Sequence, residues 1–334
     1  MQINTNKKKK VVVVGGGTGS AVALSGLKTY KDIDLSAVVV VSDNGGSTGR
    51  LRDEFGFLPV GDLRQCIAAL ASGENEREIR QLLLYRFDQN SSLQGHNLGN
   101  LILTSLESMT GSASRAVAVA SKIFRIEGRV LPISEDDAHL VIHYENGQVL
   151  VGEKNLDDSA LGGNKITRLS LDKTAQIYQG ASQAIQEANM VVFGPGDLYG
   201  SLLPNTLVEG FKEALQINQK HGGKFVYVIN LMTHFSQTHQ MTAAAHVAEV
   251  EKYCKRPVDV ILINSASISR DVLENYKDVQ DFPIVDDLGQ DPRVIREDLL
   301  STTPIAFDKN DQVRRSVVRH HKQKLAESLK RILG

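Results

Sequence analysis

The fold class of this chain is decided by the stretch Val11-Val12-Val13-Val14-Gly15-Gly16-Gly17-Thr18-Gly19-Ser20. Four consecutive β-branched residues predict a strand that is buried on both faces, as in the centre of a parallel sheet. The glycines after it permit a tight turn, and residues 20–27 then have the spacing of a helix. A strand, a glycine turn and a helix in this order predict the first βα unit of an α/β fold.

The same alternation continues along the chain. Apolar runs at residues 37–41, 190–193, 225–229 and 258–263 each end in glycine or small polar residues, as buried parallel strands do. Helical spacing recurs at residues 62–70, 76–85, 98–109, 203–217, 243–252 and 323–332. We therefore expect a Rossmann-like, doubly wound and mostly parallel sheet, with right-handed crossover helices.

Residues 128–177 depart from this alternation. Short β-like segments at residues 129–133, 139–144, 148–151 and 165–171 are separated there by Asp-Asp, Asn-Gly and Gly-Gly turns, without a long helical period. We interpret this stretch as a small β-rich insertion. Because no linker, repeat or low-complexity tract divides the chain, we expect residues 1–334 to form a single domain.

Composition and charge restrict the function classes. The 334 residues are 41% hydrophobic and 23% charged, which suits a globular protein with a sizeable core. The formal net charge of −1 provides no general attraction to nucleic acid or anionic membranes, so a small molecule is the expected partner. Cys66 and Cys254 lie far apart in sequence and predict ordinary thiols of a reducing compartment. Because neither a signal peptide nor a run of membrane-spanning length is visible, we expect a cytoplasmic protein, with homo-oligomer formation left open.

The glycine turn after the first strand is a candidate phosphate site. Backbone N–H groups from Gly15 to Gly19 can approach phosphate oxygens closely, and the dipole of the following helix favours an anion. Ser20 stands where the dinucleotide fingerprint has its last glycine, and the lysine of a P-loop is missing. The turn therefore specifies neither NAD(P) nor a nucleoside triphosphate, and a purely structural βα turn is the alternative.

The second predicted strand also ends in a glycine-rich loop, which supplies Asp43, Asn44, Gly45, Gly46 and Ser47. Consecutive strands are commonly neighbours, so the two loops would face one ligand. Asp43 could accept from a ribose hydroxyl or hold a cation, and Arg50 or Arg52 could pair with phosphate. An Asx-turn at Asp43 and solvent exposure of the arginines are equally weighted alternatives. Asp62 is a further candidate ligand, although we favour a helix N-cap for it.

Later segments add polar groups at other expected strand and helix ends. His96 and Asn100 could complete the ligand wall, with a plain helix cap at Asn97 and a structural role for His96 as alternatives. Two strand exits supply the remaining candidates, Gly194, Pro195, Gly196, Asp197, Tyr199, Ser201, Asn230 and Thr233. For His320 and His321 we favour solvent exposure over metal binding.

Sequence patterns of known catalytic centres are missing. The chain has no G-x-S-x-G elbow, no H-E-x-x-H pair and no kinase motif set. We therefore assign no catalytic residue and no metal ligand, and favour binding over catalysis.

Seven short motifs of this chain, taken in their order along the sequence, resemble those of the YvcK-like gluconeogenesis factors. They lie at residues 13–19, 42–52, 61–64, 95–100, 128–132, 194–199 and 230–233. The resemblance implies a Rossmann-like fold and a bacterial cytosolic protein that is needed for growth and cell shape on gluconeogenic carbon. It also implies UDP-sugars, such as UDP-N-acetylglucosamine, as ligands. The broader superfamily includes CofD, the 2-phospho-L-lactate transferase of deazaflavin coenzyme biosynthesis.

The chain departs from the family pattern at three places. Asn44 stands where the transferase branch has a second acidic residue, so one carboxylate of a divalent-metal site is missing. The usual Met-Thr-Gln-Pro-Gly-Glu-Thr run is replaced by Met-Thr-His-Phe-Ser-Gln-Thr at residues 232–238. Near the C-terminus, His321 replaces an acid after Arg319-His320, and the resemblance makes Arg319 a candidate diphosphate ligand.

Three hypotheses follow for the function. We expect a regulatory protein whose glycine loops and Arg319 hold the diphosphate of a nucleotide sugar, with Asp43 on the ribose or the sugar. A transferase that resembles the lactate-phosphate branch is the first alternative, in which Asp43 and Asp62 would hold Mg²⁺. A protein that binds NAD or NADP is the second.

Overall fold

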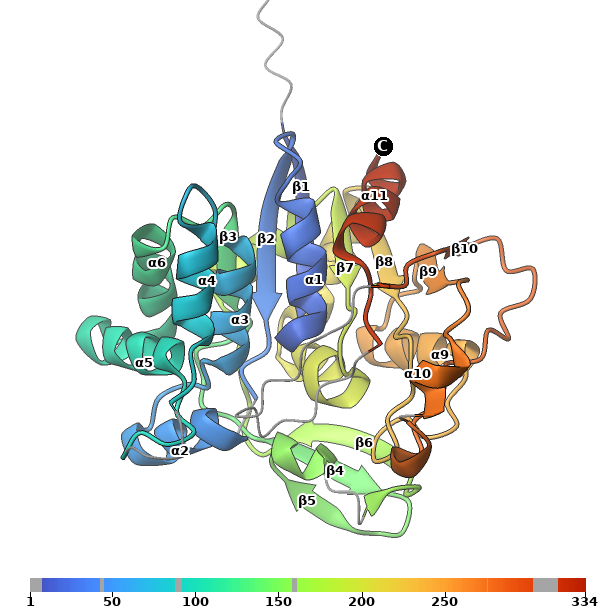
Figure 1. The fold of residues 1–334 in the computed structure, drawn as a ribbon, viewed down its shortest axis with the longest axis horizontal. Coiled ribbons are helices and arrows are strands. Elements are labelled where there is room, and N and C mark those ends of the chain that lie inside the picture. Colours follow the sequence, from blue (N-terminus) through green and yellow to red (C-terminus); the bar gives the residue numbers. More distant parts are fainter. Residues whose placement is uncertain (1–7, 43–44, 88–91, 158–160, 275, 303–317) are drawn as a thin grey trace, which may run out of the picture.

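The computed structural model describes residues 8–42, 45–87, 92–157, 161–274, 276–302 and 318–334, and Figure 1 shows their arrangement. Their main sheet is parallel throughout, in the order β10-β9-β8-β7-β1-β2-β3. Its strands are β1 (Lys9–Gly15), β2 (Ile33–Val39), β3 (Arg129–Pro132), β7 (Met190–Phe193), β8 (Lys224–Val228), β9 (Val260–Asn264) and β10 (Val294–Glu297). A second, antiparallel sheet contains β4 (Leu140–Tyr144), β5 (Val149–Val151) and β6 (Ile166–Leu171).

Helices fill the connections between these strands. The α-helices are α1 (Gly17–Leu27), α2 (Gly46–Phe55), α3 (Gly61–Leu70), α4 (Glu76–Leu84), α5 (Leu98–Thr110), α6 (Ala113–Ile123), α7 (Gln179–Gln186), α8 (Phe211–Lys220), α9 (Ala243–Cys254), α10 (Arg270–Glu274) and α11 (Lys322–Leu333). Shorter helical segments are η1 (Glu153–Asp157), η4 (Leu203–Leu207) and η5 (Lys277–Val279), which are 3₁₀ helices, and η3 (Leu198–Leu202), a π-helix. None of the helices in the described ranges has the length and apolar character needed to cross a bilayer.

The valine run predicted as a central strand lies at the centre of the sheet. β1 pairs with β2 on one side and with β7 on the other, and Val13 stands opposite both Ala37 and Val192. The chain therefore adds strands outward from β1 toward β3, and then returns to β7 and builds toward β10. Right-handed crossovers in opposite directions place helices on opposite faces of the sheet. The resulting reversal beside β1 is a topological switch point, where α/β sheets bind ligands.

The small sheet lies at the carboxyl ends of the main strands, below β2 in Figure 1. Two contacts attach it to the rest of the fold. The Arg52 guanidinium of α2 pairs with Asp137 just before β4, and the Leu169 N–H of β6 donates to the Tyr253 hydroxyl of α9 at 2.7 Å. The small sheet therefore covers the edge at which the polar loops of the main sheet end.

Two details of the fold differ from the sequence predictions. Residues 129–133 were expected in the insertion, but β3 pairs with β2 and closes one edge of the main sheet, so the separate sheet begins at β4. The helix predicted over residues 203–217 is interrupted, because Val208 is extended and Gly210 adopts a positive φ of 93° before α8 begins. Whether the chain folds as one unit stays a prediction.

Candidate functional site

A cavity of about 1340 Å³ lies at the carboxyl ends of the central strands. Loops that follow β1, β7 and β8 line it, together with the starts of α2 and α3, residues 153–154 of η1, residues 276–281 and residues 318–320. These segments are distant in sequence, and the sheet brings them together at its switch point.

The glycine turn after β1 forms one wall of this cavity. Residues 16–19 line it, whereas Gly15 does not. Gly17 has a φ of 60°, which favours glycine, and α1 begins there with its N–H groups at the cavity. A Cβ on Gly19 would lie 2.3 Å from the Pro195 carbonyl oxygen, so the turn packs directly on the loop after β7.

Asp62 belongs to the same wall, and its predicted role as a helix N-cap is wrong. Val60 is the N-cap of α3, without a side-chain cap, and Asp62 lies in the first turn. Its carboxylate lies against the glycine turn, where a Cβ on Gly16 would come within 2.0 Å of Oδ2. The carboxylate therefore contributes negative charge beside the expected phosphate position.

The loop after β2 reaches the cavity through Gly45, Ser47 and Thr48. Asp43 and Asn44 lie outside the described residues, and Gly46 begins α2. Asn100 lines the cavity and donates to the Ser47 and Thr48 hydroxyls, each at 3.3 Å. His96 does not line it; its Nδ1 pairs with Ser47 at 3.2 Å, and burial lowers its pKa. Asn97 caps α5, as one alternative predicted.

The two arginines after this loop lie elsewhere. Arg50 is exposed, and its Nη2 donates to the Gln94 carbonyl at 3.0 Å, outside the cavity lining. Arg52 is buried against Asp137 and the Ala138 carbonyl. Its side chain therefore neither faces a phosphate position in the cavity nor is exposed to solvent, so both alternatives predicted for it are wrong. The pattern Arg-x-Arg on a helix does not reveal this difference.

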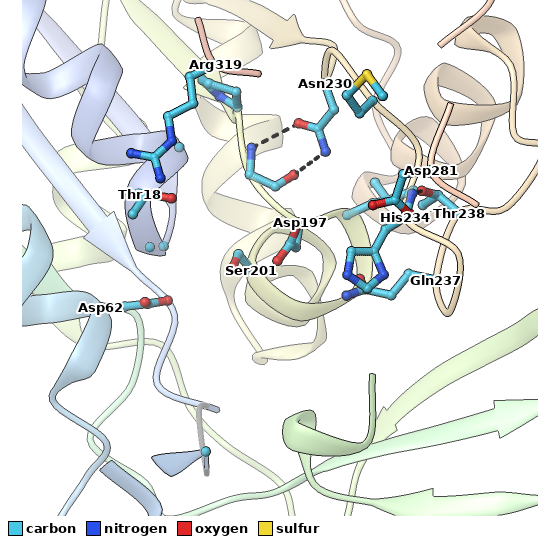
Figure 2. Close-up of a pocket in the computed structure, with 18 of the residues that line it drawn as sticks. Thr18, Asp62, Asp197, Ser201, Asn230, His234, Gln237, Thr238, Asp281 and Arg319 are labelled. Carbon is cyan, nitrogen blue, oxygen red and sulfur yellow. Dashed lines mark hydrogen bonds between the residues drawn. The ribbon is translucent and has the colours of Figure 1, made fainter. Parts of the chain in front are cut away.

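The loops after β7 and β8 are joined by a side-chain clamp. Asn230 donates to the Gly196 carbonyl at 2.9 Å and accepts from the Gly196 N–H at 3.2 Å, as the dashed lines in Figure 2 show. The clamp positions the segment that presents Pro195, Gly196, Asp197 and Ser201 to the cavity. Asn230 and Thr233 also line it.

Two candidates from this segment are outside the lining. Gly194 directly follows β7 with a φ of 85° and does not line the cavity. Tyr199 is buried in the core below the cavity, where desolvation raises the pKa of its hydroxyl. Neither residue is placed to contact a ligand directly.

Arg319 and His320 enter the cavity from the segment before α11. Figure 2 shows the Arg319 guanidinium turned toward Thr18 at the start of α1. The predicted exposure of the histidines is wrong for His320, which is buried, and burial lowers its pKa to about 4. His321 instead caps α11 by accepting from the Lys324 N–H at 3.3 Å.

Buried histidines predict an acid-sensitive fold. Burial lowers the pKa of both His246 and His320 to about 4, whereas the unfolded side chains titrate near about 6.5. Their contribution to stability is therefore complete above about pH 6.5 and is lost as the pH falls toward about 4. We expect each of the two histidines to lower the free energy of unfolding by about 2 kcal/mol between pH 7.5 and pH 5, as measured by urea unfolding. A His246→Gln variant should lose part of this dependence, and equal stability at both pH values would contradict the prediction.

Much of the lining was missed by sequence reasoning. The unpredicted charged residues are Arg64, Arg86, Glu153, Lys154, His234, Asp278, Asp281 and His320. Arg64 stands in a quoted motif, but an arginine inside a helix indicates a solvated face unless its burial is known. The segment at 276–281 reaches the cavity through long-range pairing, in which the Thr233 N–H donates to the Phe282 carbonyl at 2.7 Å. Local sequence carries no signal for such a contact.

Three arginines line the cavity together with the glycine turn, namely Arg64, Arg86 and Arg319. Guanidinium groups and backbone N–H groups suit a polyanion such as a diphosphate. Within the described ranges, no group of three His, Cys, Asp or Glu side chains could hold a metal ion.

Comparison with known proteins gives a consistent result. The family model described as 2-phospho-L-lactate transferase CofD matches residues 11–300. A relative in Thermotoga maritima is 40% identical over 317 residues, which cover 95% of this chain and 96% of that protein. A Bacillus subtilis relative, named gluconeogenesis factor, is 35% identical over 94% of both chains. The crystal structure of a Bacillus halodurans protein is similar, with a TM-score of 0.86, 34% identity, and coverage of 97% of this chain and 100% of that one. This chain therefore belongs to the CofD family and, within it, groups with the proteins named gluconeogenesis factors.

Proposed function

We propose that this protein binds a nucleotide sugar, such as UDP-N-acetylglucosamine, and thereby regulates growth and cell shape on gluconeogenic carbon in the bacterial cytoplasm. One observation carries the proposal: the Arg319 guanidinium is turned toward Thr18 in the N-terminal turn of α1, on the same side of one large cavity. Helix N-termini and arginine guanidinium groups both bind phosphate groups, and here the two lie close together. The names of the relatives support the link to gluconeogenesis.

The proposal assigns the parts of the ligand to parts of the cavity. The diphosphate lies on residues 16–19 and Arg319, with Arg64 and Arg86 supplying further positive charge. The nucleoside lies toward the loop after β2, where Gly45 and Ser47 line the cavity and Asp43 follows the strand in sequence. The rest of the cavity, toward β8, remains for the sugar.

A thermal-shift panel tests this function. At about one hundred times its dissociation constant, a ligand that binds only the folded state adds about 2.7 kcal/mol, or about 4 °C for a chain of this size. UDP-N-acetylglucosamine should produce this shift. NAD should produce a smaller one, and free N-acetylglucosamine none, because it lacks the diphosphate. A strong response to NAD with none to any UDP-sugar would replace the proposal by the dinucleotide hypothesis.

A transferase is the second candidate, because the matching family model is named for one. Asp62 lies beside the glycine turn and could serve such chemistry as a metal ligand. Asp43, which follows the second strand in sequence, could be a second ligand. Asn44 removes the next carboxylate, so we expect Mg²⁺ to change the affinity for a UDP-sugar by less than about twofold. Turnover of a guanosine-diphosphate-linked substrate with a strict Mg²⁺ requirement would favour the transferase instead.

A further inference from the structure

The side of the cavity opposite the glycine turn has a different chemistry. We call it the far wall, and it consists of Glu153, Lys154, His234, Gln237, Thr238 and Asp281. Figure 2 shows its last four members gathered on one side, across the cavity from Thr18, Asp62 and Arg319, with Asp197 and Ser201 between the two sides. The function proposed above leaves this end of the cavity for the sugar but names no residue that recognises it.

The far wall is built as a rigid unit by contacts between three segments. Asp281 Oδ1 accepts from the Phe235 N–H at 2.8 Å, and the Thr238 hydroxyl oxygen accepts from the His234 N–H at 2.9 Å. The Ser236 hydroxyl donates to the Leu156 carbonyl of η1, which connects the loop to the small sheet. A Cβ on Gly162 would overlap the Phe235 ring, so close packing fixes the same connection. These contacts hold the polar groups in place before any ligand arrives.

The imidazole of His234 is oriented within this unit. Its Nδ1 lies 3.0 Å from Ser236 Oγ. Because the Ser236 hydroxyl gives its proton to the Leu156 carbonyl, Oγ acts as the acceptor and Nδ1 carries the hydrogen. In the uncharged ring, Nε2 is then the acceptor nitrogen. An acceptor of this kind pairs with a hydroxyl or N–H donor of a ligand.

The charge of the far wall argues against a second phosphate group. Glu153 and Asp281 accompany one lysine, Lys154, and Asp278 lines the same end of the cavity. This excess of carboxylates repels anions and accepts from hydroxyl donors. Gln237 adds an amide that both donates and accepts. Carboxylate, amide and imidazole groups together match an uncharged group with several hydroxyls.

The size of the cavity leaves room for such a group. Small-molecule pockets commonly measure about 300–1,000 Å³, and this cavity is larger at about 1340 Å³. A nucleoside diphosphate on the glycine turn would therefore leave the β8 end open to a further part of the ligand.

We propose that the far wall binds the sugar ring of the nucleotide sugar and sets which sugar is accepted. The inference rests on the proposed function and adds the position and recognition of the sugar. His234 Nε2, the Gln237 amide and the Asp281 carboxylate are the groups that contact its hydroxyl or N-acetyl substituents.

Titration calorimetry with two ligands, UDP and UDP-N-acetylglucosamine, tests the inference. The variants are His234→Ala, Gln237→Ala and Asp281→Asn, the last of which keeps an oxygen to accept from Phe235. Each should weaken UDP-N-acetylglucosamine binding about 5- to 20-fold, because a ligand hydrogen bond is lost, while UDP affinity changes by less than about twofold. His221→Ala, at the exposed end of α8, is the matched control and should change neither affinity.

Two other outcomes distinguish the possible failures. If the variants weaken the binding of UDP and of UDP-N-acetylglucosamine equally, the nucleoside lies on the far wall. If the wild-type protein binds both ligands with equal affinity, or if the variants have no effect, the sugar makes no contact there. Either result overturns the inference and leaves the nucleotide-binding function intact. Failure of wild-type protein to bind either ligand overturns both. Melting temperatures of the ligand-free variants within about 2 °C of wild type show that the loop is folded.

Discussion

Replacing Arg319 by alanine is expected to weaken UDP-N-acetylglucosamine binding about 30- to 100-fold. A guanidinium that grips a diphosphate makes charge-assisted hydrogen bonds, and their loss costs about 2–3 kcal/mol. Arg319→Lys should recover only part of the affinity, because an ammonium group cannot form the two parallel bonds of the guanidinium fork. Titration calorimetry at one fixed salt concentration measures both changes.

Arg50 provides the control for this experiment. It is an arginine that the sequence made a candidate phosphate ligand, but its guanidinium donates to the Gln94 carbonyl away from the cavity lining. Arg50→Ala should therefore leave the affinity within about twofold of wild type. If Arg50→Ala abolished binding and Arg319→Ala did not, the diphosphate would lie outside the position proposed here.

Arg256→Met is expected to destabilise the fold by about 3–5 kcal/mol, because the substitution leaves buried polar partners without hydrogen bonds. Arg256 is only 2% exposed, and its guanidinium donates to the Leu215 carbonyl at 3.0 Å and the Gly223 carbonyl at 2.7 Å. It also pairs with Asp259 at 2.8 Å, within the loop that connects α9 to β9. Urea unfolding at neutral pH measures the loss.

An exposed arginine serves as the comparison for that measurement. Arg129 is 52% exposed in its side chain and lies 4.0 Å from Asp34, so Arg129→Met should cost less than about 1 kcal/mol. Similar losses in the two variants would contradict the role assigned to the buried guanidinium.

Local sequence predicts the central part of this fold well, because its signals are local. The valine run of β1, the glycine turn after it and the polar ends of β7 and β8 each follow from a few adjacent residues. Their convergence follows from the general rule for parallel sheets. The fold class and family membership are confirmed for this reason.

The parts that escaped prediction depend on contacts between distant segments. β3 resembles an insertion strand until its pairing with β2 is known, since four residues do not specify a partner. Arg50 and Arg52 have the same sequence environment, yet one is exposed and the other is buried against Asp137. The far wall depends on pairing between Thr233 and Phe282, and that pairing is set by the whole sheet.

A crystal structure of the protein with UDP-N-acetylglucosamine tests the central claim most directly. The account predicts density for the diphosphate against the N–H groups of residues 16–19, within hydrogen-bonding distance of the Arg319 guanidinium. It also predicts the uridine toward Gly45 and Ser47. Nucleotide density in any other part of the molecule, with the glycine turn and Arg319 free of phosphate, would contradict it.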